Sequence, residues 1–307
     1  MDYRRADFDI LRRTKYGIGF HWTTWTAPRE GEPLPFEEAV EAFDVPAFVR
    51  QAVEAGAGHV LFTMTHMKHH MPCPNPVVDE LLPGRTCRRD LLGEIADGLA
   101  AEGILLMLYY NHGVWGNDPE WSRAAGAEEV DPRIYFENLG RELRWIGERY
   151  GRKVVAFWFD HGPSHFADFP YEELTAAAKA GNPGRLVCYN SGVETHHLHT
   201  ECQDYWAGEV CRLNYLPRGP LTPSGLPWYS FTEWHPDLIH YGCGEWGLDM
   251  ERRGQDWPAP CACSVEAYLR RFLDHGGAVT FNLFCYQDGS AYEPDLAVMR
   301  EIKKRFR

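Results

Sequence analysis

Short apolar runs recur along the 307-residue chain, and helical or loop segments separate them. The clearest run, residues 154–160, is apolar or aromatic until an aspartate ends it, which predicts a strand buried on both faces of a parallel sheet. Seven more strands are predicted over residues 17–22, 59–66, 104–111, 185–190, 204–209, 228–233 and 278–284. Eight strands that alternate with helices predict a single-domain α/β fold, a (β/α)8 TIM barrel over residues 1–307.

Helical patterns lie between these runs. Asp44 precedes a predicted helix over residues 45–55, which has Pro46 in its first turn and Gly56 after its last. Prolines interrupt the segment 217–227, so helices after the fifth, sixth and seventh strands are poorly marked. The other predicted helices cover residues 90–101, 132–150, 171–180, 265–274 and 295–305.

The net charge of the chain limits the classes of partner that it could bind. The formal net charge is −13 at pH 7, whereas nucleic acids and anionic membranes are bound by positive patches. The basic residues 303–305 are interpreted as the solvated end of a helix. The longest apolar stretch, residues 104–110, is far too short to span a bilayer. We therefore expect no nucleic-acid partner and no membrane association.

The number and spacing of the cysteines indicate the cellular compartment of the protein. Nine of them are scattered along the chain without a C-x-x-C pair, and one residue separates Cys261 from Cys263. An odd, scattered set fits reduced thiols rather than a disulfide framework. Residues 1–7 lead into no apolar segment of the kind that a secretory signal contains. These features predict a cytoplasmic protein.

Polar or aromatic side chains stand at the end of every predicted strand. Because the carboxyl ends of barrel strands meet on one face, we expect these side chains to surround one site. A ring of such residues favours a site of binding or catalysis more strongly than any one of them alone. They are His21, Trp22, His66, Tyr110, Asn111, Asp160, His161, Asn190, Glu209, Glu233 and Asn282.

Two carboxylates on one face suggest hydrolysis of a glycoside. In a retaining enzyme one carboxylate attacks the anomeric carbon, while the other protonates the leaving oxygen and then activates water. Asp160 is the predicted nucleophile, and Glu209 is the predicted acid/base, with Glu233 as the second choice. Gly208, directly before Glu209, would let a backbone or a ligand come close. This chemistry calls for a small-molecule glycoside and for neither a cofactor nor a metal.

Several segments, taken in chain order, resemble one known family. Residues 15–22 read K-Y-G-I-G-F-H-W, residues 89–91 R-D-L, residues 108–110 L-Y-Y and residues 158–160 W-F-D. A further stretch, residues 276–289, begins with two glycines and ends in Asp-Gly. These segments resemble the α-L-fucosidase family (glycoside hydrolase family twenty-nine), whose barrel opens with K-F-G-I-F-I-H-W and whose W-F-D contains the nucleophile.

The resemblance implies a catalytic barrel in which Asp160 attacks the sugar. It also implies that His21, Tyr110 and Trp158 line the pocket of the sugar ring that is cleaved off. The remaining predicted substrate-binding residues are Trp22, His66, Asn111, His161 and Asn190.

The chain also departs from the family pattern. Only His66 aligns with the family's pair of sugar-binding histidines, His161 stands where the family has glycine, and Asn190 stands where an arginine is expected. The family's C-terminal β-sandwich has no counterpart, which favours self-association into a homo-oligomer through the face left exposed. We therefore expect an exo-acting retaining enzyme on a small glycoside, with deoxy sugars among the candidates.

Two other functions compete with this interpretation. A metal-dependent hydrolase could use imidazole ligands, since histidines cluster at His66, His69 and His70 and again at His196, His197 and His199. A catalytically silent sugar-binding barrel would also lack some of the family's sugar-binding residues.

Overall fold

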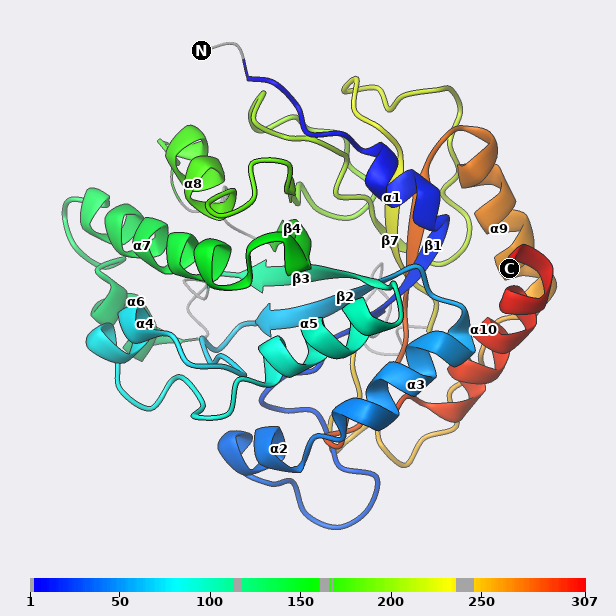
Figure 1. The fold of residues 1–307 in the computed structure, drawn as a ribbon, viewed down its shortest axis with the longest axis horizontal. Coiled ribbons are helices and arrows are strands. Elements are labelled where there is room, and N and C mark those ends of the chain that lie inside the picture. Colours follow the sequence, from blue (N-terminus) through cyan, green and yellow to red (C-terminus); the bar gives the residue numbers. More distant parts are fainter. Residues whose placement is uncertain (1–2, 113–117, 161–165, 167, 236–245) are drawn as a thin grey trace.

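The computed structural model describes residues 3–112, 118–160, 166, 168–235 and 246–307 (Figure 1). Its strands form one parallel sheet that curls in the order β5-β4-β3-β2-β1-β8-β7-β6. The strands are β1 (Tyr16–Phe20), β2 (His59–Thr65), β3 (Leu105–Asn111), β4 (Val154–Asp160), β5 (Leu186–Tyr189), β6 (Glu209–Cys211), β7 (Tyr229–Glu233) and β8 (Ala278–Asn282). The predicted α/β fold with a TIM-like barrel is confirmed, and every predicted strand except the sixth is placed to within two residues.

Helices cover the outside of this sheet. They are α1 (Asp9–Thr14), α2 (Phe36–Ala42), α3 (Val45–Ala55), α4 (Pro76–Leu81), α5 (Leu91–Ala101), α6 (Pro119–Ala125), α7 (Arg133–Tyr150), the 3-10 turn η1 (Gly151–Lys153), α8 (Tyr171–Ala178), α9 (Ala262–Asp274) and α10 (Glu293–Phe306). In Figure 1, α3 lies between α5 and α10, while α7 packs beside α8. Asp44 caps α3 as predicted, since its carboxylate accepts a hydrogen bond from Ala47 N at 2.8 Å. The short helices α1, α2, α4 and α6 were not predicted.

Successive strand residues divide between two hydrophobic layers. On β3, Met107 and Tyr109 pack inside the barrel, in the same cluster as Trp158 of β4. Leu108 and Tyr110 point the other way and pack between the sheet and the helices. This alternation follows from the pleat of a strand and decides which aromatic side chains can reach the barrel interior.

The seam between β5 and β6 is bridged by Asp204, through both its backbone and its side chain. In the described part of the chain these two strands do not pair with each other. Instead, Asp204 N donates to Val187 O at 2.8 Å, and the Asp204 carboxylate accepts from Val187 N, also at 2.8 Å. The ladder with β7 begins only at Glu209, so the prediction of a strand over 204–209 is wrong in its bounds.

Gly208 explains where the sixth strand begins. Its φ is +59°, a conformation that side chains disfavour, and a Cβ built there would lie 2.1 Å from Tyr229 O. The backbone therefore bends against β7 at this point, and the extended ladder starts one residue later. Gly208 allows the close approach of a backbone, one of the two alternatives that the sequence left open.

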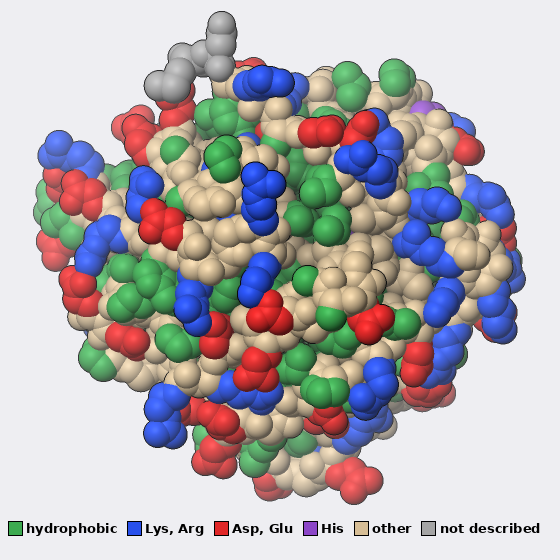
Figure 2. All heavy atoms as spheres, viewed as in Figure 1, with side chains coloured by type: hydrophobic (Ala, Val, Ile, Leu, Met, Phe, Trp, Pro, Cys, Tyr) green, Lys and Arg blue, Asp and Glu red, His purple; other side chains and the backbone are tan. Residues whose placement is uncertain are grey.

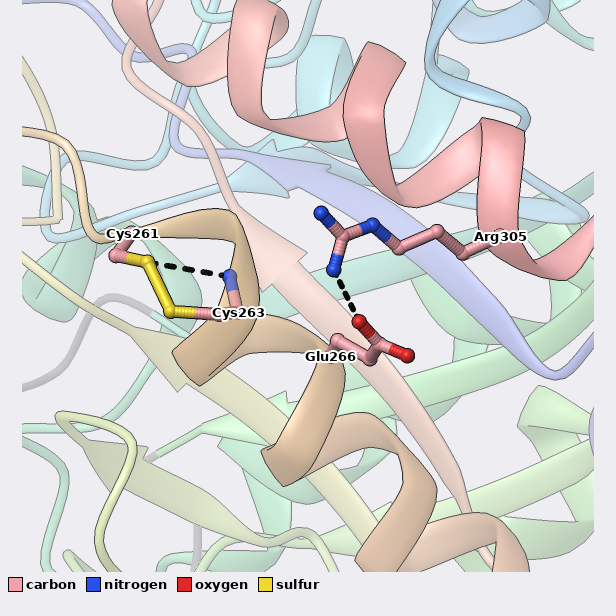
Figure 3. Close-up of a disulfide and its surroundings, with 4 residues drawn as sticks. All are labelled: Cys261, Cys263, Glu266 and Arg305. Carbon is pink, nitrogen blue, oxygen red and sulfur yellow. Dashed lines mark hydrogen bonds and ion pairs between the residues drawn. A yellow bond between two sulfur atoms is a disulfide. The ribbon is translucent and has the colours of Figure 1, made fainter.

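One cysteine pair departs from the expected reduced state. Figure 3 shows the disulfide between Cys261 and Cys263 at the start of α9, where the two Cα atoms are 5.3 Å apart. The chain bends into the helix there, and Cys261 Sγ also accepts a hydrogen bond from Cys263 N at 3.3 Å. This bend brings the two thiols into bonding range, so the expectation of reduced thiols is wrong for this pair. Five other described cysteines are free and buried: Cys73, Cys87, Cys188, Cys202 and Cys285.

The outer surface mixes charges of both signs. Figure 2 shows acidic and basic side chains interspersed over the face that carries α3, α5 and α7. Ion pairs join many of them, among them Arg149 with Asp90 at 2.6 Å and Arg300 with Glu54 at 2.8 Å. Exposed pairs of this kind add only ~0–1 kcal/mol each to stability. Among the described helices, none is both long and apolar enough to cross a bilayer.

Candidate active site

A cavity of about 350 Å³ lies at the carboxyl ends of the barrel strands. This is the face where (β/α)8 enzymes carry their chemistry. The cavity is lined by His21, His66, Tyr109, Trp158, Asp160, Gly192, Val193, Glu209, Phe231 and Trp246. Its size and its few polar groups among aromatic walls are typical of a site for a small molecule.

Two carboxylates meet in this cavity and share one amide. Asp160 ends β4 and Glu209 begins β6. The side chain of Asn190 lies between them, and its Nδ2 donates to Asp160 Oδ1 at 2.9 Å and to Glu209 Oε2 at 2.7 Å. Because one nitrogen reaches both oxygens, the two carboxylates are held close together although β5 and β6 are not paired.

Further donors orient Asp160 from the other side. Tyr109 donates its hydroxyl to Asp160 Oδ2 at 2.5 Å, and Asn111 Nδ2 donates to the same oxygen at 3.3 Å. Asn111 sits opposite Asp160 in the register of β3 and β4. Only 6% of Asp160 is exposed, so the carboxylate is fixed at the cavity wall.

The environment of Glu209 favours its protonated form. Burial raises the pKa of Glu209, and the negative charge of Asp160 raises it further, to about 7, while the hydrogen bond from Asn190 opposes the shift. Glu209 is only partly buried and opens onto the cavity. At neutral pH a carboxyl with this pKa can both give and take a proton.

We expect the Glu209 carboxyl to titrate near pH 7 in the native protein and at a lower pH in the Asp160→Asn variant. The substitution removes the neighbouring charge and leaves the burial, so the pKa moves only part of the way back to 4.5. Carboxyl ¹³C NMR of glutamate-labelled protein measures the pKa of Glu209 in both proteins. Because the native pKa is raised, Glu209 lowers the free energy of unfolding as the pH rises from 4.5 to 7. An unchanged titration in the variant would contradict the coupling.

Aromatic rings form the walls around these carboxylates. Tyr109 stacks on Trp158 with ring centroids 5.2 Å apart and on His66 at 5.3 Å. His21 stacks on Phe231 at 5.5 Å. Aromatic faces next to fixed polar groups suit a ring that is apolar on one side and hydroxylated at its edge.

The structure separates the predicted site residues into two groups. It brings His21, His66, Trp158, Asp160 and Glu209 to the cavity. Asn111 bonds to Asp160, and Asn190 lies between Asp160 and Glu209. His161 lies outside the described residues. The expectation is corrected for Trp22, Tyr110 and Glu233, which do not line the cavity.

Trp22 and Tyr110 belong to the hydrophobic layer outside the sheet. Trp22 is 2% exposed and packs against Phe36 and Phe62, and its Nε1 donates to a backbone oxygen. Tyr110 donates its hydroxyl to the buried Glu142 at 2.6 Å. Both are buried in this outer layer, and neither lines the cavity.

Tyr109, Phe231 and Trp246 line the cavity but were not predicted. Tyr109 pairs with Trp158 in the parallel register of β3 and β4. The alternation along β3 could have identified it, because residues 107, 109 and 111 share the inward side. Trp246 precedes α9 on a long connection, and nothing in the local sequence indicates its place.

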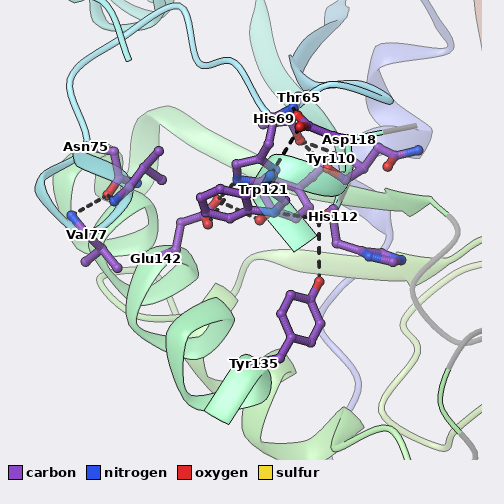
Figure 4. A network of polar contacts seen from close by, with 12 residues as sticks. Thr65, His69, Asn75, Val77, Tyr110, His112, Asp118, Trp121, Tyr135 and Glu142 are labelled. Atoms are coloured by element: carbon purple, nitrogen blue, oxygen red, sulfur yellow. Dashed lines mark hydrogen bonds and ion pairs between the residues drawn. The ribbon is translucent and has the colours of Figure 1, made fainter. Parts of the chain in front are cut away.

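The histidines that follow β2 separate in space. His66 faces the cavity, while His69 is fully buried and bonds through Nε2 to Glu142 at 3.0 Å. Figure 4 shows His69 and Tyr110 pointing toward Glu142. His70 packs on Phe36 instead. Within the described ranges no three His, Cys, Asp or Glu side chains are grouped so that they could hold a metal ion.

Fold and site together define a (β/α)8 barrel with a close pair of carboxylates in the cavity at the carboxyl end of the barrel. No known family model and no curated protein sequence matches the chain. Solved structures match it in fold. The α-L-fucosidase AlfC from Lactobacillus casei, bound to its α-L-fucose product, is 15% identical, with a TM-score of 0.67 over 97% of this chain and 98% of its own.

Two further α-L-fucosidases have the same barrel. The enzyme from Bacteroides thetaiotaomicron is 16% identical, with a TM-score of 0.68 over 99% of this chain and 75% of its own. Isoenzyme 1 from Paenibacillus thiaminolyticus is 19% identical, with a TM-score of 0.69 over 97% of this chain and 75% of its own. At these identities the likeness concerns the fold, and at that level the resemblance expected from the sequence is confirmed.

Proposed function

We propose that this protein is a retaining glycoside hydrolase that removes a single α-L-fucose or a related deoxy sugar from a small glycoside. The observation that carries the proposal is the amide of Asn190, which donates to both Asp160 and Glu209. The two oxygens can be no farther apart than the sum of these two hydrogen-bond lengths. That limit on the two nearest oxygens fits the ~5–5.5 Å separation of a retaining pair better than the ~6.5–9.5 Å of an inverting pair.

In the proposed double displacement Asp160 is the nucleophile and Glu209 is first the general acid and then the general base. Asp160 attacks the anomeric carbon and forms a glycosyl ester, while the bond from that carbon to the leaving oxygen breaks and Glu209 gives this oxygen its proton. Glu209, now a carboxylate, then takes a proton from water. The resulting hydroxide displaces Asp160 from the anomeric carbon, so one water is consumed and both side chains return to their first state.

Hydrolysis of aryl glycosides tests the function directly. The panel contains the 4-nitrophenyl α-L-fucoside, other 6-deoxyhexosides, and α- and β-linked hexosides and pentosides. Release of nitrophenol from one member identifies the sugar and supports the proposal. Binding of a free monosaccharide without any turnover would instead favour the sugar-binding barrel. The structures similar to this chain include one with 4-nitrophenyl-α-L-fucopyranoside bound to a mutant of AlfC, which makes the fucoside the first choice.

Glu209→Gln is expected to lower kcat/KM about 10²–10⁴-fold for glycosides with a poor leaving group. The loss is expected to be much smaller for a 2,4-dinitrophenyl glycoside, because that leaving group needs no proton. Glu194→Gln is the matched control. Glu194 is on the connection between β5 and β6, which leads to Glu209, but it is not among the cavity-lining residues. An equal loss for both leaving groups would contradict the role of general acid.

A further inference from the structure

Another buried carboxylate lies behind the cavity wall. Glu233, at the end of β7, is fully buried, and its two oxygens have different partners. Oε1 is 2.8 Å from His235 Nδ1, and Oε2 accepts from Asn282 Nδ2 at 2.7 Å. His235 Nε2 lies 2.9 Å from Asp295 Oδ1. Burial opposes a charge on His235, but the two carboxylates outweigh it and raise its pKa to about 10, so an imidazolium accompanies Glu233.

These contacts leave the amide of Asn282 only one orientation. Its Nδ2 faces the carboxylate of Glu233 and also donates to the backbone oxygen of Trp246 at 2.9 Å. A backbone oxygen can only accept, so the nitrogen must be on this side of the amide. The Asn282 oxygen therefore faces His21, 3.0 Å from Nδ1.

The orientation of Asn282 decides where His21 carries its proton. An amide oxygen can only accept, so Nδ1 of His21 must be the donor. Burial lowers the pKa of His21 to about 4, against the opposing influence of Asn282 and Asp160. The ring is then neutral, and its other nitrogen, Nε2, is left as a bare acceptor. His21 lines the cavity, and no described residue donates to this nitrogen.

We propose that Glu233 and Asn282 are positioning residues that hold His21 as the Nδ1–H tautomer, so that Nε2 accepts a hydrogen bond from a hydroxyl of the ligand. That the ligand is a sugar rests on the proposed function, whereas the tautomer does not. The arrangement makes the pocket selective: a hydroxyl at this position is accepted, while an ether, a carbonyl or a fluorine has no proton to give.

The tautomer can be measured without any turnover. In protein labelled with ¹⁵N-histidine, long-range ¹H–¹⁵N correlation spectra distinguish a protonated from a bare ring nitrogen. For the wild type at pH 7 we expect His21 to show a protonated Nδ1 and a bare Nε2. A protonated Nε2 in the wild type would overturn the proposal, even if the glycosidase assays succeed. Conversely, failure of those assays would leave this result unaffected.

Glu233→Gln tests how the tautomer is held. His235 N donates to Glu233 Oε1, so a glutamine would turn its oxygen toward His235 and its NH2 group toward Asn282. Two donors would then face each other, and Asn282 would lose its fixed orientation. We expect the Nε2–H tautomer, which imidazole side chains prefer in water, to become the major form of His21 in this variant.

Two further variants make the result specific. Glu142→Gln is the matched control, because Glu142 is also fully buried and bonded to a histidine, His69, but does not contact Asn282. Its His21 signals should stay as in the wild type. Asn282→Leu removes the acceptor for Nδ1 and should release the tautomer as Glu233→Gln does. The proposal is overturned if Glu233→Gln leaves the His21 signals unchanged or if Glu142→Gln shifts them equally.

Discussion

Replacing Asp160 with asparagine is expected to lower kcat/KM by roughly 10⁴-fold or more on whichever aryl glycoside the wild type hydrolyses. An amide is a poor nucleophile, and no other described carboxylate could attack the anomeric carbon from the position of Asp160 beside Glu209. The loss should appear in kcat, because the side chain acts on the reacting carbon rather than on ligand affinity alone. Initial rates measured over a range of substrate concentrations separate the two constants.

Rescue by a small anion distinguishes the nucleophile from a residue needed for shape. In Asp160→Ala, added azide should enter the vacated space and form a glycosyl azide of inverted anomeric configuration. Asp168→Asn provides the matched control, since Asp168 lies on the connection after β4 but is exposed. A loss below tenfold in Asp160→Asn, or no azide product from Asp160→Ala with folding intact, would remove Asp160 from the proposed role.

Arg185→Met is expected to lower the free energy of unfolding by about 4 kcal/mol. Arg185 is fully buried before β5, and within the described residues its guanidinium donates to five backbone oxygens. These oxygens belong to Gly147, Gly151, Val154, Ala178 and Ala180. Methionine fills much of the same space but leaves all of these acceptors without the donor. Urea unfolding followed by tryptophan fluorescence measures the change.

The control for this prediction is a second arginine. Arg144→Met changes an exposed arginine on α7, and its effect should stay within about 0.5 kcal/mol. Arg185→Lys should be intermediate, since an ammonium has three N–H donors for the five oxygens. A loss below 1 kcal/mol in Arg185→Met would show that water or a local shift satisfies these oxygens.

Much of the fold could be predicted because buried parallel strands are short, apolar and ended by polar residues. Residues 154–160 form β4 as predicted, and Asp160 stands where the strand meets the cavity. The predicted bounds of the sixth strand are wrong because tertiary contacts set them. Asp204 bonds to β5, and Gly208 packs against β7. A pattern of apolar residues contains neither constraint.

The site could be predicted to the level of strand ends but not of side-chain direction. The L-Y-Y motif contains both Tyr109 and Tyr110 and does not indicate which of them faces the site. The pleat of β3 decides this, since it places only Tyr109 inside the barrel. Glu233 also stands at a strand end, yet its partners turn it into the protein. That Asn190 links the two carboxylates depends on contacts between strands far apart in the sequence, which a single chain does not reveal.

The unpaired seam of the sheet lies beside the two proposed catalytic carboxylates. Asp160 is on β4 and Glu209 on β6, and no continuous ladder of backbone hydrogen bonds joins these strands through β5. Their separation is therefore set by side chains, chiefly Asn190, rather than by the fixed spacing of a sheet. In evolutionary terms, substitution at a few positions could change the distance between the two carboxyl groups, which decides between retention and inversion, while the barrel itself stays intact.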